Sequence, residues 1–472
     1  NILNELAIKY DIKPERVANF PHLEIAAIFL AYCSSYFLKE KGEIVFVLPR
    51  SFFSADHHDN TRSGKTKGFR LKQIWDLNDV SPLFRIPSSV LFASKEKDNV
   101  KRNILSSGID GITFSGNLLY HNCNLESTKE LLKENSSKWY YSKQGKSTAL
   151  SLHKYKKQLL SNPYKDSFRQ GATIVPRSFY FVELMQDVPE NFQDRIINIK
   201  TSNAINADAK MPWKDIELKG RIESNFLFRT ALSKSILPFA LYKPELIILP
   251  ITIKIDEENN KNIILYSADE LMSEGYINAS RWFKSAERFW EQLRTENNQK
   301  YSAEYYLNWQ NKLTSQSLSS PYLVLYNSSA ADANATIVKR EDYDLEFFVE
   351  SVCYVFYTNS MNEAYYISTI LNSSIPNLMM KDFQAKGLFG ARHVHKKILD
   401  IYFPKYDEEN EKHINLAGLG EEAHKKTSQY LLTNPPKKVL SPMHLGRLRT
   451  DIKKHLPTEM KEIDKIVKQL IR

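Results

Sequence analysis

Residues 42–92 read GEIVFVLPRSFFSADHHDNTRSGKTKGFRLKQIWDLNDVSPLFRIPSSVLF, and this stretch decides the fold. Its first apolar run, residues 43–48 (EIVFVL), is rich in β-branched and aromatic side chains, which predicts a fully buried strand of a parallel sheet. Two further runs follow at residues 73–77 and 88–93. The gap between them is too short for the helical crossover that parallel strands need, so they are expected to pair antiparallel. The stretch therefore predicts a doubly wound sheet that ends in an antiparallel pair.

Length, composition and charge bound the class of protein. The 472 residues suffice for roughly three domains of about 150 residues each, and the 42% hydrophobic and 12% aromatic content indicates folded cores. Lys and Arg number 65 against 55 Asp and Glu, which gives a formal charge of +10 and a pI near 9.1. This excess favours a polyanionic partner, with nucleic acid before membrane. A basic chain that is merely soluble remains the alternative.

The cysteines and the hydropathy pattern indicate a cellular location. Cys33, Cys123 and Cys353 are odd in number and too far apart for a zinc spacing, which indicates a reducing compartment and buried thiols. No stretch reaches the roughly 18–20 apolar residues of a membrane span, and the chain shows no signal peptide at its start. A cytoplasmic protein without a membrane partner is expected.

Residues 24–92 resemble the segment that follows the catalytic motif in large prokaryotic adenine-N6 DNA methyltransferases of the restriction-modification and phage-defence type. The matching pieces are residues 22–26 (HLEIA), 42–53, 54–64 and 75–92. The family ends its catalytic sheet with the same reversed strand pair. An expected helix over residues 21–39, the strand after it and the reversed pair then correspond to the second half of a methyltransferase sheet, and its first half is not found in this sequence.

Segments further along the chain also resemble this family. Residues 171–183 (GATIVPRSFYFVE) and 220–238 are similar to the middle of these enzymes, and residues 364–404 are similar to their target recognition domain and to that of type I specificity subunits. The expected fold class is α/β: the C-terminal half of a Rossmann-like methyltransferase sheet with an antiparallel terminal strand pair, then an α+β target recognition domain and a helical tail. The expected domains are residues 1–100, 101–435 and 436–472.

The resemblance implies transfer of a methyl group from S-adenosyl-L-methionine to N6 of an adenine that is flipped out of double-stranded DNA. The family's Gly-rich cofactor loop and Asn-Pro-Pro-aromatic tetrapeptide are not found here. Residues 434–437 (NPPK) copy three letters of that tetrapeptide, but Lys437 cannot stack on a base, so a linker is expected. The cofactor is expected to bind mainly to the N-terminal half of the domain. The chain alone is therefore expected to be inactive and to need a segment or polypeptide that carries this half, with other restriction or defence subunits as further candidate partners.

The resemblance also implies an aromatic face for the flipped adenine in the last strand of the sheet. Phe92 is the candidate and Phe84 the substitute. Either residue could instead be an ordinary core aromatic, and that alternative stays open.

Two basic stretches are candidate DNA contacts. Basic side chains in the polar loop 51–66 and beside it are expected near the DNA backbone, unless Arg50 and Asp56 simply lock the loop. Residues 384–397 (QAKGLFGARHVHKK) combine glycines with basic side chains, as phosphate contact and base-edge reading require; the alternative is an ordinary strand with its lysines in water. The candidate DNA-binding residues are Arg50, His57, His58, Arg62, Lys65, Lys67, Gln384, Lys386, Arg392, His393, His395, Lys396 and Lys397.

Other functions are weaker readings of the sequence. The run Asp56-His57-His58-Asp59 is not expected to bind metal, because adjacent histidines point in different directions and no further ligand follows at a suitable spacing. A nuclease would need a carboxylate cluster, and residues 256–258 (DEE) instead indicate a solvated hairpin tip. The remaining alternative is a non-catalytic specificity subunit that binds DNA and positions other enzymes, although such a subunit has no need for the block 42–92.

Overall fold

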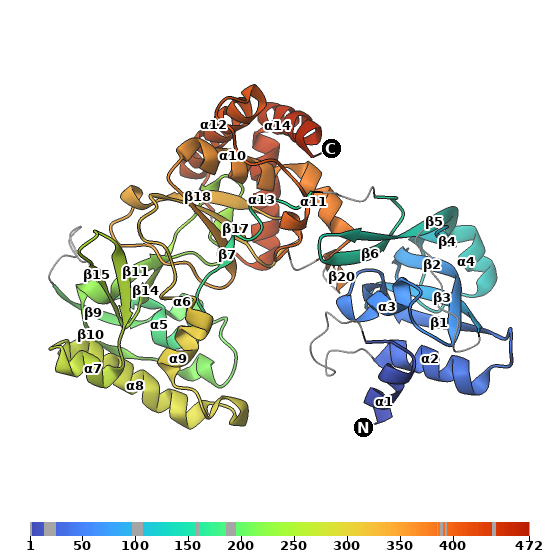
Figure 1. Ribbon diagram of the computed structural model, residues 1–472, viewed down its shortest axis with the longest axis horizontal. Helices are drawn as coiled ribbons and strands as arrows, with labels where there is room; N and C mark the ends of the chain where they lie inside the picture. Colours follow the sequence, from blue (N-terminus) through green and yellow to red (C-terminus); the bar gives the residue numbers. More distant parts are fainter. Residues whose placement is uncertain are drawn as a thin grey trace. The chain divides into compact units, whose positions relative to one another are not determined.

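The computed structural model describes residues 2–13, 25–96, 107–155, 160–185, 195–384, 386–387, 390–391, 394–436 and 440–471. They form two compact units (Figure 1). Unit 1 comprises Asn1–Asn162, Ala330–Asp332 and Pro376–Phe403, and unit 2 comprises Pro163–Ser329, Ala333–Ile375 and Pro404–Arg472. Unit 1 thus continues beyond residue 100, where the first domain was expected to end, and includes part of the segment assigned to target recognition.

Unit 1 is built on a six-stranded mixed sheet with the order β1-β3-β2-β4-β5-β6. Strand β3 lies between β1 and β2 and runs antiparallel to both, whereas β2 and β4 run parallel. The antiparallel pairing predicted from the short gap between the two apolar runs is confirmed, with Ile74 opposite Leu91. The elements of unit 1 are α1 (Ile2–Lys9), α2 (Ile25–Phe37), β1 (Glu43–Pro49), η2 (Arg50–Phe53), η3 (Asp56–His58), α3 (Asp59–Arg62), β2 (Phe69–Ser81), β3 (Ser88–Lys95), β4 (Ile109–Asn117), α4 (Leu125–Leu131), β5 (Lys133–Gln144), β6 (Ser147–Ser151), β20 (Lys386–Gly387), β21 (Gly390–Ala391) and η9 (Ile398–Asp400).

Strand β1 differs from its prediction. It pairs antiparallel with β3 and is the edge strand of the described sheet. Val45 and Val47, on one of its faces, are 54% and 52% exposed. A strand is buried on both faces only when layers cover both, and no layer covers these two valines in the part of the chain that the structure describes. The strand is therefore a half-exposed edge strand and not a fully buried strand of a parallel sheet.

The opposite face of this sheet carries the core of unit 1. Leu48 from β1, Ile74 from β2 and Leu91 from β3 are buried there. Helix α2, which was expected over residues 21–39 and spans Ile25–Phe37, lies against β1, β2 and β3 (Figure 1). Its alanines and leucine pack into the same cluster. The core thus lies on one face of the sheet, and at β1 the other face is exposed through Val45 and Val47.

Unit 2 is α+β in composition, with a four-stranded sheet β18-β17-β19-β7, a three-stranded sheet β10-β9-β8 and three two-stranded pairs. Its elements are β7 (Arg169–Gln170), α5 (Arg177–Tyr180), β8 (Val182–Leu184), β9 (Ile196–Thr201), α6 (Asn203–Asn206), η4 (Trp213–Asp215), β10 (Lys219–Glu223), η5 (Ser224–Phe226), β11 (Leu227–Thr230), β12 (Ile236–Leu237), β13 (Ala240–Leu241), β14 (Glu245–Ile248), β15 (Ile251–Ile255), β16 (Lys261–Leu265), α7 (Ala268–Ser273), α8 (Ile277–Leu293), η6 (Glu296–Asn298), α9 (Ala303–Leu307), η7 (Trp309–Asn311), β17 (Tyr322–Asn327), β18 (Ala335–Lys339), η8 (Arg340–Asp342), β19 (Cys353–Thr358), α10 (Met361–Asn372), α12 (Glu411–Thr433), α13 (Pro442–His455) and α14 (Pro457–Leu470). Helix α11 (Ser374–Lys381) begins in unit 2 and ends in unit 1.

Helix α8 anchors the core around the three-stranded sheet. Its Trp282 and Phe283 are buried, and the indole Nε1 of Trp282 donates to the carbonyl of Phe179 at 3.0 Å. The sequence of residues 279–293 (ASRWFKSAERFWEQL) has the helical period of apolar residues that predicts this helix. The hairpin of β15 and β16 carries Asp256 at its exposed tip, as the sequence indicated.

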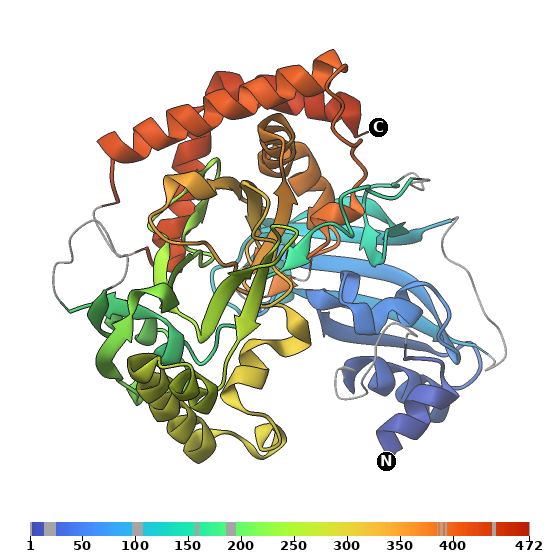
Figure 2. The same cartoon turned by 60° about the vertical axis from the view of Figure 1, so that its left-hand side comes forward.

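The chain ends in helices that pack onto unit 2 itself. Helix α12 lies against α10 (Figure 2), and α14 contacts both. The predicted helical tail is present as two helices, because Pro457 has no N–H to continue α13 and instead begins α14. Ile452 of α13 and Ile463 and Val467 of α14 are buried. Among the described helices, none is both long and apolar enough to cross a lipid bilayer.

Two glycines of α12 are expected to respond oppositely to substitution by alanine. A Cβ at Gly420 would lie 3.0 Å from the carbonyl oxygen of Tyr365 and would collide with Oγ1 of Thr369, whereas a Cβ at Gly418 meets nothing within 4 Å. Alanine stabilises a helix interior by up to about 1 kcal/mol relative to glycine. Gly418→Ala is therefore expected to raise the melting temperature, and Gly420→Ala to cost about 1–3 kcal/mol through overpacking against α10.

Differential scanning calorimetry of the two variants and the wild type checks this expectation. Gly418→Ala is the matched control because it lies in the same helix and changes the same atoms. A stabilised Gly420→Ala variant would contradict the close packing of α12 on α10.

Candidate nucleic-acid interface

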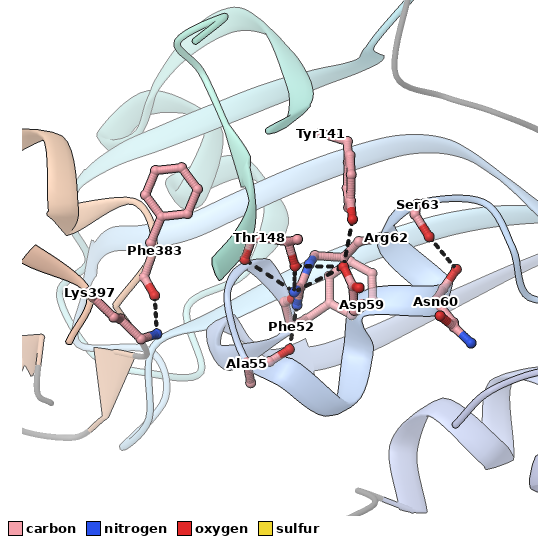
Figure 3. Close-up of polar contacts among 10 residues, drawn as sticks. All are labelled: Phe52, Ala55, Asp59, Asn60, Arg62, Ser63, Tyr141, Thr148, Phe383 and Lys397. Atoms are coloured by element: carbon pink, nitrogen blue, oxygen red, sulfur yellow. Dashed lines mark hydrogen bonds and ion pairs between the residues drawn. The ribbon is translucent and has the colours of Figure 1, made fainter. Parts of the chain in front are cut away.

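Arg62 lies at the centre of the polar loop that follows β1. Its side chain is 0% exposed. Its guanidinium donates to the carbonyl oxygens of Phe52 at 2.8 Å and Ala55 at 2.6 Å, and to Oγ1 of Thr148 at 2.8 Å (Figure 3). A guanidinium that is buried in this way cannot reach a DNA phosphate. Arg62 therefore holds the loop in its fold, and the prediction that it contacts DNA is corrected.

Asp59 balances the buried charge of Arg62. One of its carboxylate oxygens lies 3.8 Å from the guanidinium and accepts a hydrogen bond from the hydroxyl of Tyr141 at 2.8 Å. Thr148 links the pair, since its hydroxyl accepts from Arg62 and donates to Asp59 (Figure 3). Burial, and then the neighbouring carboxylate, raise the pKa of Tyr141 well above its usual value. The tyrosine hydroxyl thus stays protonated and serves as a fixed donor.

Arg50 is also engaged inside unit 1. Its guanidinium makes a two-pronged ion pair with Asp76 of β2, at 2.9–3.0 Å, and lies over the ring of Phe53 at 5.0 Å. The expected alternative was that Arg50 and Asp56 lock the loop. The structure gives Arg50 a locking role, with Asp76 as its carboxylate partner.

The remaining candidates of this loop differ in exposure. His58 is buried, with its ring 5.2 Å from that of Phe52, and His57 is half-buried beside it. Lys67 forms an ion pair with Asp11 at 3.0 Å. Lys65 is exposed. Of the loop's predicted DNA contacts, Lys65 is the one whose charge is most accessible to a phosphate.

The second basic stretch lies beside this loop, although more than 300 residues separate them in sequence. The hydroxyl of Ser54 donates to the carbonyl of Gln384 at 2.8 Å. The turn between β5 and β6 completes the arrangement: Ser147 donates to Asp400 at 2.9 Å, and a Cβ at Gly145 would collide with the Asp400 carboxylate. We call residues 50–66, 142–151 and 382–400 the loop cluster. Unit 1 thus brings the two predicted DNA-contacting stretches together.

Within residues 384–397 the accessible side chains are fewer than predicted. Gln384 is 1% exposed, so its amide is not presented to a base edge. Lys397 donates to the carbonyl of Phe383 (Figure 3), Lys396 is half-buried and His395 is exposed with a positive φ of 39°. Lys386 lies in β20, and its side chain is not described; Arg392 and His393 lie outside the described residues.

The loop cluster contains exposed lysines that the sequence reading missed. Lys143 and Lys146 flank the turn at Gly145 and are exposed. Lys154, just outside the loop cluster, is also exposed, and its ammonium lies 5.9 Å from the ring of Tyr140. The run 143–146 (KQGK) is a basic turn signal that could have identified them. They add positive charge to the same loops that carry Lys65.

The two candidate stacking residues occupy different places. Phe92 lies inside β3 on the open face of the sheet, opposite Val45, with its ring 4.8 Å from that of Trp75. Phe84 lies in the connection between β2 and β3 and is 52% exposed. A stacking residue needs a ring face that a base can reach. Phe84 meets this need better than Phe92, whose ring packs against a neighbour.

Metal and cofactor binding have no candidate in this interface. Among the residues described, no three His, Cys, Asp or Glu side chains are placed to share a metal ion. On the open face of β1, Val45 and Val47 are aliphatic and offer no hydrogen bond to an amino acid or nucleoside group. These two side chains therefore supply no contact for S-adenosylmethionine, and we derive no step through that cofactor.

Comparisons with known proteins place the fold. No family model and no curated protein matches this sequence. A solved structure of MmeI, a Type IIL restriction-modification enzyme in complex with DNA, matches 96% of this chain with a TM-score of 0.50 and 11% sequence identity. Two DNA-bound Type ISP restriction-modification enzymes also match: LlaBIII (TM-score 0.40, 10% identity, 93% of this chain and 29% of that chain) and a nuclease-deletion mutant of LlaGI (TM-score 0.41, 10% identity, 90% and 39%).

The match to MmeI shows a shared fold. The chain spans about half the length of the MmeI chain, since the match covers 50% of it. The mixed sheet of unit 1, the α+β unit 2 and the helical tail thus follow the fold of part of a restriction-modification enzyme. Function has to be argued from the site, because one fold can serve several functions.

Proposed function

We propose that this chain is the DNA-engaging part of a restriction-modification type enzyme, and that it supplies the end of an adenine-N6 methyltransferase domain together with target recognition. The observation that carries the proposal is the position of β3, which is inserted antiparallel between β1 and β2. This is the reversed pair that the sequence resemblance implies, in a chain that shares its fold with MmeI over 96% of its length.

In this proposal the exposed cations of the loop cluster contact the DNA backbone. Lys65, Lys143 and Lys146 lie on loops that Arg62 and Asp400 hold in fixed positions. Fixed loops lose little conformational freedom on binding, so more of the electrostatic attraction appears as affinity. These lysines set position on the duplex and carry no sequence information by themselves.

The flipped adenine would stack on Phe84. Flipping a base out of the duplex costs a few kcal/mol, and stacking against an aromatic side chain offsets that cost. The exposed ring of Phe84, with the exposed Arg85 next to it in the β2–β3 connection, suits this role. S-adenosylmethionine would be held chiefly by a segment or partner that carries the N-terminal half of the domain, and the half-exposed edge strand β1 is where that half would join the sheet.

A non-catalytic specificity subunit is the second candidate. The aliphatic open face of β1, which offers no group for a cofactor, favours it. A methyl-transfer assay distinguishes the two candidate functions. A chain that completes a methyltransferase gains activity when a polypeptide with the N-terminal half of the domain is added, whereas a specificity subunit does not.

Duplex binding by the purified chain is expected to weaken by about 100-fold or more between about 50 and 200 mM salt, because each neutralised phosphate contributes a slope of about −0.9 to the plot of log affinity against log salt. Replacing Lys65 and Lys143 with glutamine should make the slope of this plot shallower by about 1.8, the value expected for the loss of two phosphate contacts. Fluorescence anisotropy with a labelled duplex measures both effects.

The matched control replaces Lys129 and Lys133, two exposed lysines outside the loop cluster, of which Lys133 begins β5 at the end opposite the cluster. It removes the same charge. Equal losses of slope in the two double variants would show that the cluster is not the binding surface, and a wild type without measurable duplex affinity would contradict the proposed function.

A further inference from the structure

Unit 2 contains a cavity between β10 and α8 that the loop cluster does not involve. Its volume is about 270 Å³. Figure 1 shows α8 running beside β10. From α8 the lining includes Asn278, Arg281, Trp282 and Ser285, which recur at the three- and four-residue spacing of one helix face. The helix therefore presents one face to the cavity, on which three polar side chains surround the aromatic ring of Trp282.

The cavity is positively charged. Lys219 and Arg221 from β10 and Arg281 from α8 line it, and all three are exposed. Lys219 pairs with Glu217 at 3.1 Å. Within the described part of the chain, the guanidinium groups of Arg221 and Arg281 have no hydrogen-bond or ion-pair partner. Two adjacent, uncompensated guanidinium groups repel each other and favour an anion between them.

The nearby carboxylate does not cancel this charge. Glu223, at the end of β10, accepts hydrogen bonds from the backbone N–H groups of Asn278 at 2.9 Å and Ala279 at 2.8 Å. Its charge is thus directed at the first turn of α8, where the helix dipole favours an anion. The helix terminus is already occupied by this carboxylate, so the cavity depends on its arginines.

Trp282 and Gly220 belong to the apolar part of the cavity lining. Trp282 is 4% exposed and holds its ring 3.5 Å from the position that a Cβ on Gly220 would take. Gly220 therefore leaves open a space that a side chain would fill. Ligand pockets measure about 300–1,000 Å³, so a cavity slightly below this range suits one small group and not a whole nucleoside triphosphate.

We infer that this cavity binds a phosphate of the DNA backbone through Arg221 and Arg281. The planar guanidinium fork matches phosphate geometry and stays charged at every physiological pH. The inference rests on the proposed function, since DNA supplies the phosphodiester. It gives unit 2 a backbone contact of its own, separate from the loop cluster of unit 1.

The test is duplex titration by fluorescence anisotropy at several salt concentrations with the double variant Arg221→Gln/Arg281→Gln. Affinity is expected to fall about tenfold or more at moderate salt, and the salt slope to become shallower by about 1.8, the value for two lost contacts. The variant Arg221→Lys/Arg281→Lys keeps the charge and loses the fork, so it should retain the wild-type slope with reduced affinity.

The control variant Lys254→Gln/Arg447→Gln removes the same charge from exposed positions of unit 2 that do not line the cavity. Circular dichroism and thermal melting show whether each variant is folded, which is expected because the substituted side chains are exposed. A second arm replaces the duplex with inorganic phosphate and with a nucleoside triphosphate, to separate backbone binding from binding of a free anion.

The inference is supported if the wild type binds the duplex and Arg221→Gln/Arg281→Gln loses affinity while the control variant does not. Duplex affinity that is the same in this variant and the wild type overturns the inference and leaves the proposed function standing. Arginine-dependent binding of the free nucleotide without duplex binding overturns both.

Discussion

Replacing Arg62 with methionine is expected to destabilise unit 1 by about 3–5 kcal/mol, the cost typical of removing one partner of a buried ion pair. Methionine replaces the aliphatic part of the arginine side chain but has no hydrogen-bond donor. The carbonyl oxygens of Phe52 and Ala55 then lose their partner at 2.8 and 2.6 Å, and Asp59 keeps its charge without the adjacent cation. The loop after β1 and its link to Thr148 should open together.

Urea denaturation followed by hydrogen exchange, which resolves the amides of unit 1 from those of unit 2, measures this effect. Lys65→Met is the matched control, since Lys65 lies in the same loop, is exposed and should change stability by no more than about 0.5 kcal/mol. The contrary result is that the amides of residues 50–66 are protected from hydrogen exchange equally well in the Arg62→Met and Lys65→Met variants. That result would show that the buried guanidinium does not organise the loop.

Unit 2 is expected to lose about 3 kcal/mol of stability between pH 7 and pH 4 through His424 alone. The side chain projects from α12 and is half-buried, near the rings of Phe239 and Tyr365, and its Nε2 lies 3.2 Å from Oγ of Ser368. Burial, and then the nearby Lys339, lower the pKa of His424 from 6.5 to about 3. The folded protein thus holds this imidazole neutral.

The direction of this pH dependence follows from proton binding. Between pH 6.5 and about 3 the unfolded chain binds a proton at His424 and the folded chain does not. The contribution of neutral His424 to the free energy of unfolding is therefore fully present above pH 6.5. It is lost as the pH falls, by about 1.4 kcal/mol per pH unit. His424→Gln removes this titration.

Urea unfolding of the wild type and of His424→Gln at pH 7, 5.5 and 4 isolates the effect, because the other groups, including the partly buried His413, titrate in both proteins and cancel in the difference. The wild type should lose about 3 kcal/mol more than the variant over this range. Parallel pH profiles for the two proteins would mean that the folded protein does not hold His424 neutral.

Local patterns predicted those parts of the fold that depend on neighbouring residues. The short gap between the runs 73–77 and 88–93 required an antiparallel pair, and the helical period in residues 279–293 required α8. Both hold because strand pairing across a short connection and amphipathic periodicity are properties of a few adjacent residues.

Features that depend on distant contacts could not be read in this way. Arg62 is an arginine in a polar loop, and such a residue is normally exposed. It is buried here because Thr148, 86 residues later, accepts its hydrogen bond. The same holds for Gln384, whose carbonyl meets Ser54 and whose side chain is buried. Several of the predicted DNA-binding residues are therefore less accessible than the sequence suggested, and their contact with DNA stays a prediction.

The edge position of β1 is a third case of this kind. An apolar run such as EIVFVL gives the same pattern for a central strand and for an edge strand whose open face awaits a partner. Which of these it is depends on the strands and helices around it, and the described residues place only β3 beside it.

The central claim is that this chain reads a specific duplex DNA sequence for a modifying enzyme. The most direct test is selection: the purified chain is incubated with a pool of randomised duplexes at about 100 mM salt, where nonspecific phosphate contacts are weakened, and the retained duplexes are sequenced. The account predicts enrichment of one short, adenine-containing sequence. A retained pool indistinguishable from the input, or no retention at any salt concentration, would contradict it.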